Sequence, residues 1–405
     1  MARTVFRGGR VFDGTGADPT DGDIVIENDR IVDVGPRLDG DTLIDVTGRT
    51  ILPGLFDCHT HVVISHVDLW KAAQQPFSYQ FFEAQANLAA TLRTGITTAR
   101  DAGGADLGIK QAIEDGLIAG PRLQISLVML SQTGGHGDDW YPSGALVPFM
   151  ISHPGRPDGI IDGPDEARRK VRELVRGGAD VIKVATSGGV LSARDDPRHA
   201  HLRPTELETI VEEATAAGIF VMAHAQGADG IKNAVRAGIR SIDHGIYLDD
   251  EAIELMQARG TWFVPTLLAP QGVIDAVAAG VPLPPAIVDK AHRVVEIHRA
   301  AFRHAVEAGV RIAMGTDSGV TPHGRNLREL ALMADGGMRP AAVLEATTRS
   351  AAQLLGLDDE LGTLEPGKLA DLVIVTGDPY DVATLPERID EVWKAGVRVA
   401  GGPAQ

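Results

Sequence analysis

The stretch Ile51-Leu52-Pro53-Gly54-Leu55-Phe56-Asp57-Cys58-His59-Thr60-His61 joins an apolar run to two closely spaced histidines. The run predicts a buried strand, and alternate side chains of a strand point to the same face. His59 and His61 therefore share a face, where both imidazoles can reach one metal ion, for which histidine is the commonest neutral ligand. The alternative is two ordinary histidines near a turn.

The central part of the chain contains further apolar, strand-like runs, separated by segments long enough to form helices. Eight runs predict strands, at residues 56–61, 96–101, 123–130, 181–186, 220–225, 241–244, 262–268 and 311–317. Repeated β-then-α units predict a parallel sheet, and eight of them predict an α/β fold closed as a (β/α)8 TIM barrel. A doubly wound open sheet would usually carry a Gly-rich nucleotide turn after its first strand, and the sequence has none there.

Two helices have clear end signals. Thr205-Glu206-Leu207-Glu208 is a capping box that predicts a helix start, and Gly218 predicts its end. A second predicted helix, over residues 300–308, ends at Gly309 in the same way.

Both ends of the chain show a different pattern, in which short runs alternate between apolar and polar residues. Residues 4–6, 10–12, 24–27, 30–34 and 42–46 predict strands near the start, and residues 370–375 and 391–399 predict the same near the end. We therefore expect residues 1–50 and 360–405 to build one small β domain, a β-sandwich, around a barrel at residues 51–359.

Composition bounds the class of protein. The formal charge of −17 argues against a nucleic-acid surface, which needs a basic footprint. No apolar run is long enough for a membrane span or a signal peptide, and the single cysteine, Cys58, fits a reducing compartment. These features predict a cytoplasmic protein that binds a small-molecule substrate, with no nucleic-acid or membrane partner. A homo-oligomer is also expected.

Several predicted strands end in a group that can bind metal or move a proton. They are Lys183, His224, His244 and Asp317, in addition to His59 and His61. Singly, such a histidine is more often a hydrogen-bonded structural residue, and such an aspartate a turn or helix cap. Because all six groups meet at one barrel rim, a metal site becomes the leading interpretation. A lysine inside a buried strand must find a partner or lose its charge, so an ion pair with a neighbouring acid is the alternative for Lys183.

These residues and their neighbours resemble the amidohydrolase superfamily, and most closely its binuclear-metal members, such as Xaa-Pro dipeptidases and Lys/Arg carboxypeptidases. The resemblance spans nearly the whole chain. Its motifs are the opening stretch, Gly95–Asp101, Gly134-Gly135-His136-Gly137-Asp138, Ile182–Val190, Met222-Ala223-His224-Ala225, Asp243-His244-Gly245 and Gly367–Val373.

The resemblance implies two divalent metal ions, expected to be zinc. His59, His61 and Asp317 would hold the more buried ion, and His224 and His244 the second. Lys183 would be N6-carboxylated and would bridge the pair. A metal-bridging hydroxide would attack the scissile carbonyl of an amide bond, in dipeptides or N-acyl amino acids. Asp317 would act as the proton acceptor, and His136 would bind the carbonyl or the developing oxyanion. The alternative for His136 is a solvent-exposed loop histidine.

Two long loops, at residues 131–164 and 187–204, predict the substrate pocket. Arg194, Arg198, His199 and His201 are candidates for binding a substrate carboxylate. The paired acids 138–139 or 195–196 could instead receive a basic side chain, and solvated loop charge is the alternative for each of these residues. After His224-Ala225 the dipeptidase-like relatives tend to place a tyrosine, whereas this chain has Gln226, a departure that puts prolidase activity in doubt.

Other functions share parts of this ligand set. Aryl amides, carbamates, ureas or lactones are alternative substrates for the same centre, as are phosphotriesters. A mononuclear deaminase would not need Lys183, and it usually carries a Glu soon after the fifth-strand histidine, where this chain has none. A non-catalytic scaffold would be expected to have lost ligands, and all six are present.

Overall fold

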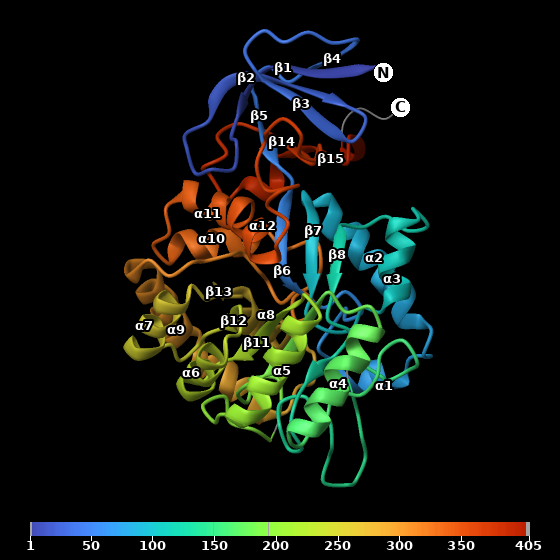
Figure 1. The fold of residues 1–405 in the computed structure, drawn as a ribbon, viewed down its shortest axis with the longest axis vertical. Coiled ribbons are helices and arrows are strands. Elements are labelled where there is room, and N and C mark those ends of the chain that lie inside the picture. Colours follow the sequence, from blue (N-terminus) through green and yellow to red (C-terminus); the bar gives the residue numbers. More distant parts are fainter. Residues whose placement is uncertain (1, 149, 193, 402–405) are drawn as a thin grey trace.

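The computed structural model describes residues 2–148, 150–192 and 194–401, and it shows a β-sheet part above a larger α/β part (Figure 1). Both chain ends lie at the sheet part, as the figure shows. The α/β part carries parallel strands surrounded by helices. This arrangement confirms the α/β class.

One mixed sheet of eight strands draws on both ends of the chain. Its strands are β1 (Arg3–Val11), β2 (Thr20–Glu27), β3 (Arg30–Gly35), β4 (Thr42–Asp45), β5 (Arg49–Pro53), β14 (Leu372–Thr376), β15 (Ile389–Lys394) and β16 (Val397–Gly401). The order is β16-β15-β14-β5-β1-β2-β3, and β4 also pairs with β1. One link between the ends is the antiparallel pair of β14 and β5, in which Leu372 lies opposite Pro53. The structure records one hydrogen-bonded sheet, so the sandwich stays a prediction.

Two details of this sheet differ from the prediction. Residues 4–6 and 10–12 belong to one strand, β1, whose pairing with β2 shifts register between Phe6 and Gly9. Residues 391–399 form two strands instead of one, because the chain turns at Ala395 and Gly396, both with positive φ. Apolar periodicity cannot reveal such a turn when the flanking strands are equally apolar.

The α/β part contains two parallel sheets. One has the order β6-β7-β8 and the other β13-β12-β11-β10-β9. The strands are β6 (Leu55–Thr60), β7 (Ile96–Asp101), β8 (Arg122–Ile125), β9 (Met129–Leu130), β10 (Val181–Ala185), β11 (Phe220–Ala225), β12 (Ser241–His244) and β13 (Trp262–Val264). Most of the predicted strands are thereby confirmed.

The third, seventh and eighth predicted strands need correction. The third is split into β8 and β9 around Leu127, whose φ of 66° interrupts an extended strand. The seventh stops at Val264, because helix α8 begins at Leu268. Residues 311–317 form no strand, only single parallel bridges from Ile312 to Phe263 and, just beyond, from Ser318 to Thr60.

Helices cover the parallel strands. They are α1 (Leu69–Gln74), α2 (Tyr79–Arg93), α3 (Leu107–Glu114), α4 (Pro164–Arg176), α5 (Pro204–Ala216), α6 (Ala228–Ala237), α7 (Asp250–Arg259), α8 (Leu268–Ala278), α9 (Pro285–Ala308), α10 (Arg328–Asp335), α11 (Pro340–Ala346) and α12 (Arg349–Leu355), with a 3-10 turn at Leu385–Glu387. Their apolar faces and the strands share the largest buried cluster of side chains. Within the described ranges, no helix has both the length and the apolar character that a membrane crossing requires.

The predicted helix ends are close to those observed. Helix α9 ends before Gly309, which adopts the left-handed conformation, as predicted. Helix α5 begins one residue earlier than the predicted capping box, because Pro204 occupies its first position. The observed box is therefore closed by Glu206 and not by Glu208, since the Glu206 carboxylate accepts the backbone N–H of Arg203.

Candidate metal centre and active site

Six predicted ligand residues come together where the parallel strands end. His59 lies on β6 and His61 follows it, Lys183 lies on β10, His224 on β11 and His244 at the end of β12. Asp317 closes the segment that bridges β13 and β6. The register places His224 opposite Asp243, and Ala225 opposite His244, so neighbouring strands deliver their imidazoles to the same edge.

The imidazoles form a row across the site. The ring centroids of His61 and His59 are 5.3 Å apart, and those of His59 and His244 are 4.9 Å apart. His224 follows at 4.5 Å from His244, and His136 lies at 4.1 Å from His224 with the two rings stacked. All of these rings line one cavity of about 380 Å³, together with Lys183 and Asp317.

Hydrogen bonds determine which ring nitrogens are available as ligands. His59 Nδ1 contacts Asp243 Oδ2 at 2.7 Å, and His61 Nδ1 donates to Gly103 O at 2.8 Å. Their Nε2 atoms both face Asp317 Oδ1, at 3.3 and 3.2 Å. A ring that donates through Nδ1 keeps the Nε2 lone pair for a metal.

The second pair of histidines uses its nitrogens in opposite ways. Thr266 Oγ1 donates to Pro265 O, so it accepts from His244 Nδ1 at 2.7 Å and leaves the Nε2 lone pair of His244 available to a metal. His224 instead uses Nε2, which is 3.2 Å from Gly188 O, and keeps Nδ1. The four imidazoles therefore offer four lone pairs with defined tautomers.

Protonation also fits a metal centre. Burial, reinforced by neighbouring positive groups, holds the pKa of His224 and of His244 well below the usual range, so both rings are neutral. Burial would raise the pKa of Asp317, but His59 and His61 outweigh it and the pKa falls well below its usual range. Neutral imidazoles and an ionised carboxylate are the protonation states that metal binding requires. Ligand atoms of His59, His244 and Asp317 lie within 4.8 Å of one another.

Two of the predicted ligand residues have an unusual backbone. His244 has a φ of 75° and Asp317 a φ of 59°, the left-handed region that non-glycine residues rarely adopt. Such conformations persist only where the surrounding structure fixes them, and they cluster at functional sites.

Asp243, in the motif Asp243-His244-Gly245, is fully buried and is not one of the predicted ligands. Its Oδ2 atom lies 2.7 Å from His59 Nδ1 and 3.3 Å from Lys183 Nζ, and its Oδ1 lies 3.5 Å from Arg100 Nη2. The unmodified Lys183 therefore forms an ion pair with Asp243, which is the alternative that the sequence left open for this lysine. Burial would raise the pKa of Asp243, but the Lys183 and Arg100 charges lower it. An acid inside a buried strand, next to a candidate ligand, was the signal that could have identified it.

The remaining predicted site residues are placed differently. His136 and Gln226 line the cavity, and the Oε1 atom of Gln226 is buried without a partner among the described residues. Arg194 also lines the cavity, with its guanidinium 4.7 Å from the ring centroid of Trp140. His201 is buried and is not one of the residues that line the cavity, so its substrate contact stays a prediction. Its backbone N–H donates to Thr186 O, which holds it against β10.

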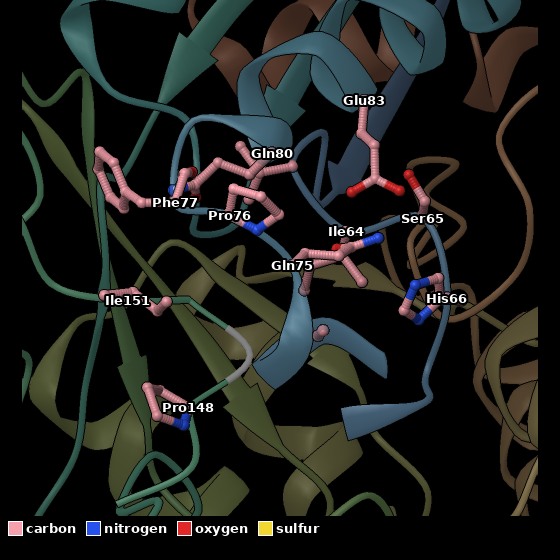
Figure 2. A pocket seen from close by; sticks show the side chains of 12 residues that line it. Ile64, Ser65, His66, Gln75, Pro76, Phe77, Gln80, Glu83, Pro148 and Ile151 are labelled. Atoms are coloured by element: carbon pink, nitrogen blue, oxygen red, sulfur yellow. The ribbon is translucent and has the colours of Figure 1, made fainter. Parts of the chain in front are cut away.

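The cavity walls are mostly apolar. The apolar side chains of the lining include Met129, Trp140, Tyr141, Met150 and Val190. The lining also includes His298, a buried histidine of α9 that was not among the predicted site residues. A second hollow of about 40 Å³ shares Ile64 and Pro148 with this cavity. Figure 2 shows it between the segment at Pro76 and Phe77 and the loop at Pro148 and Ile151. It contains none of the six predicted ligands.

Comparison with known proteins gives consistent results. Residues 50–400 match the amidohydrolase family. Ochratoxinase from Aspergillus niger is 36% identical over 365 residues, which cover 85% of this chain and 75% of the fungal protein. The solved structure of a Xaa-Pro dipeptidase with bound methionine in its active site has a TM-score of 0.90 at 33% identity, covering 99% of this chain and 100% of that one. A prolidase complexed with N-methylphosphonate-L-proline has a TM-score of 0.89 at 35% identity, covering 98% and 99%.

Proposed function

This chain belongs to the amidohydrolase family, and from that membership we propose a metal-dependent hydrolase that cleaves amide bonds of small substrates such as dipeptides or N-acyl amino acids. The observation that carries the proposal is the row of imidazoles with Asp317 and Lys183 on the floor of one apolar cavity. The relatives support it, because the similar solved structures include a Xaa-Pro dipeptidase and a prolidase.

The ligand set fits two divalent ions. We assign His59, His61 and Asp317 to one ion and His224 and His244 to the other, with zinc as the expected metal because imidazole and carboxylate suit it. Divalent ions in such a centre supply acidified water and Lewis acidity. Carboxylation of Lys183 would turn a buried cation into an anionic ligand, which removes the cost of burying an ammonium beside two cations.

Side chains of the protein supply the remaining chemistry. Asp317 is ionised and lies at the centre of the ligand set, so its carboxylate can accept a proton from the attacking water and pass it to the leaving amine. His136 holds Nδ1 toward Asp195 and Ser192, which leaves Nε2 for the scissile carbonyl. Nε2 is a donor in the doubly protonated imidazolium, in which Nδ1 donates to Asp195, and in that form His136 would stabilise negative charge as it develops on that oxygen.

The walls suggest how a substrate is held. Arg194 offers a guanidinium for a substrate carboxylate, and the unpaired Oε1 of Gln226 offers an acceptor for a substrate N–H. The apolar and aromatic lining favours a second candidate, hydrolysis of aryl amides, because an aromatic leaving group would pack against Trp140 and Tyr141.

We also propose that the two parallel sheets close into a (β/α)8 barrel over residues 51–359, with residues 1–50 and 360–405 as the small β domain. Hydrogen bonds support the closure on both sides of the eighth segment: Phe263 N donates to Arg311 O, and Cys58 N donates to Met314 O. At the other junction, β8 ends at Ile125 and β9 begins at Met129, so the third unit would join the two sheets there.

A substrate screen tests the function. The zinc-loaded protein is incubated with dipeptides, N-acyl amino acids and aryl amides, and amine release is measured together with metal content. Release of an amine and two metal ions per chain are expected. One ion per chain would favour a deaminase instead. A metal-loaded protein that releases no amine from any of these compounds would contradict amide hydrolysis.

A further inference from the structure

We propose that Lys290, acting through Asp195, is a positioning residue that holds His136 in the active site. The inference rests on the proposed function, since it assigns a support to the residue proposed to bind the carbonyl. Lys290 is far from the ligand residues in the sequence and belongs to helix α9, outside the strand ends.

Lys290 fixes the loop that follows β10. Its buried ammonium donates to three main-chain oxygens, Gly189 O at 2.9 Å, Ser192 O at 2.7 Å and Asp195 O at 2.6 Å. It also contacts the carboxylate Oδ1 of Asp195 at 3.2 Å. These oxygen partners hold the buried ammonium in one position. An exposed ion pair, by contrast, contributes little to the stability of the fold.

Asp195 connects Lys290 to His136, because its carboxylate contacts both side chains. Its Oδ2 accepts from His136 Nδ1 at 3.2 Å and from the backbone N–H of Gly189 at 3.1 Å. Ser192 Oγ bonds to the same carboxylate and lies 3.0 Å from His136 Nδ1. The described residues of the loop thus surround one carboxylate, whose charge is balanced by Lys290.

The His136 ring is confined on two further sides. It stacks on His224, and it lies so close to Gly189 that a Cβ on that glycine would be 2.1 Å from His136 Cε1. With Nδ1 engaged, Nε2 is the ring atom without a partner among the described residues. Without Lys290, the carboxylate of Asp195 would be left buried and uncompensated, and the loop that holds it would lose its anchor.

A double-mutant cycle tests the inference. Lys290→Met and His136→Ala are made singly and together, and kcat and KM are measured for the best substrate. Lys368→Met is the matched control, because Lys368 also donates to loop carbonyls, those of Asp358 and Leu361, but lies in a segment that does not line the cavity.

If Lys290 acts through His136, its loss lowers kcat more than it raises KM. The expected fall in kcat for Lys290→Met is at least tenfold and no larger than the ~10²–10³-fold typical of losing one oxyanion donor. In the His136→Ala background the same change has less than about a twofold further effect, because coupled residues are not additive. Equal losses of kcat in both backgrounds would overturn the inference.

A readout without turnover separates this inference from the proposed function. Hydrogen exchange of peptides covering residues 187–200 is expected to accelerate in Lys290→Met and to remain unchanged in Lys368→Met. If the parent protein hydrolyses no substrate, the proposed function fails, and exchange alone decides whether Lys290 holds the loop. Unchanged exchange in Lys290→Met would overturn the positioning role.

Discussion

Asp139 differs from the other acids that line the cavity. Its carboxylate has no hydrogen-bond or ion-pair partner in the part of the chain that the structure describes, and burial raises its pKa to about 7. Asp138, its neighbour, accepts the backbone N–H groups of Gly134 and Trp140. An unpaired carboxylate in an apolar wall costs stability whenever it is ionised.

Replacing Asp139 by Asn should therefore stabilise the protein in a pH-dependent way. Between about pH 4 and pH 7 the unfolded chain loses the Asp139 proton while the folded protein keeps it, so the free energy of unfolding of the parent falls as the pH rises. Asp139→Asn removes this loss. The expected gain is on the order of 1–2 kcal/mol at pH 8 and near zero at pH 4, after discounting for the open cavity.

Thermal melting at the two pH values measures this difference. Asp138→Asn is the control, and it should give no gain at pH 8, because it disturbs a hydrogen-bonded carboxylate. An Asp139→Asn protein that melts like the parent at pH 8 would mean that Asp139 ionises in the folded state at no cost.

At the residue scale, the positions of the six proposed ligands at strand ends were enough to predict that they lie close together. The tautomers could not be predicted, because they depend on Thr266 and Gly188, which reach the rings from other elements. Asp243 was missed for a related reason: its partners His59 and Arg100 lie on different strands.

At the scale of elements, one contact between the loops after β9 and β10 involves a glycine. Gly189, in the loop after β10, lies directly against the His136 ring from the loop after β9. Any side chain at residue 189 must displace either the ring or the loop.

Gly189→Ala is therefore expected to lower kcat by at least tenfold, approaching the ~10²–10³-fold loss of removing an oxyanion donor, without loss of the fold. Circular dichroism checks the fold, and steady-state kinetics gives kcat. Gly35→Ala is the matched control, since a Cβ at Gly35 would have no atom within 4 Å. Parent-like turnover in Gly189→Ala would show that the His136 ring is not needed in its present position.

Elements with a strong local pattern were predictable and the others were not. Residues 96–101 and 220–225 match β7 and β11 at both ends. The split at Leu127 comes from a positive φ, and the single bridges at Ile312 and Ser318 come from tertiary pairing. Neither the positive φ nor the tertiary pairing can be predicted from the periodicity of apolar residues.

At the scale of the molecule, the proposed ligands come from segments spread over residues 59–317, so bound metal should link much of the fold. Ions that bind only the folded state raise its stability, by about 2.7 kcal/mol at a hundredfold excess over Kd. Removing metal with a chelator is expected to lower the melting temperature by several degrees, and adding zinc should restore it.

Calorimetry of the chelated and zinc-restored protein measures this shift. His244→Ala should show a smaller shift, because it removes one ligand and leaves the rest of the proposed set. A melting temperature that is insensitive to both chelator and zinc would contradict a structural link through metal.

The pairing of β5 with β14 has a consequence for how the chain is made. Strand β5 already pairs with β1 along one side, but its other side receives β14 only when Leu372 has been synthesised. At ~5–20 residues per second, the roughly 320 intervening residues take roughly 15–60 s to leave the ribosome. During that time the nascent chain carries an open strand edge, the kind of surface that recruits unwanted partners. The strand that precedes the first two histidines therefore keeps one unpaired edge until most of the chain has been made.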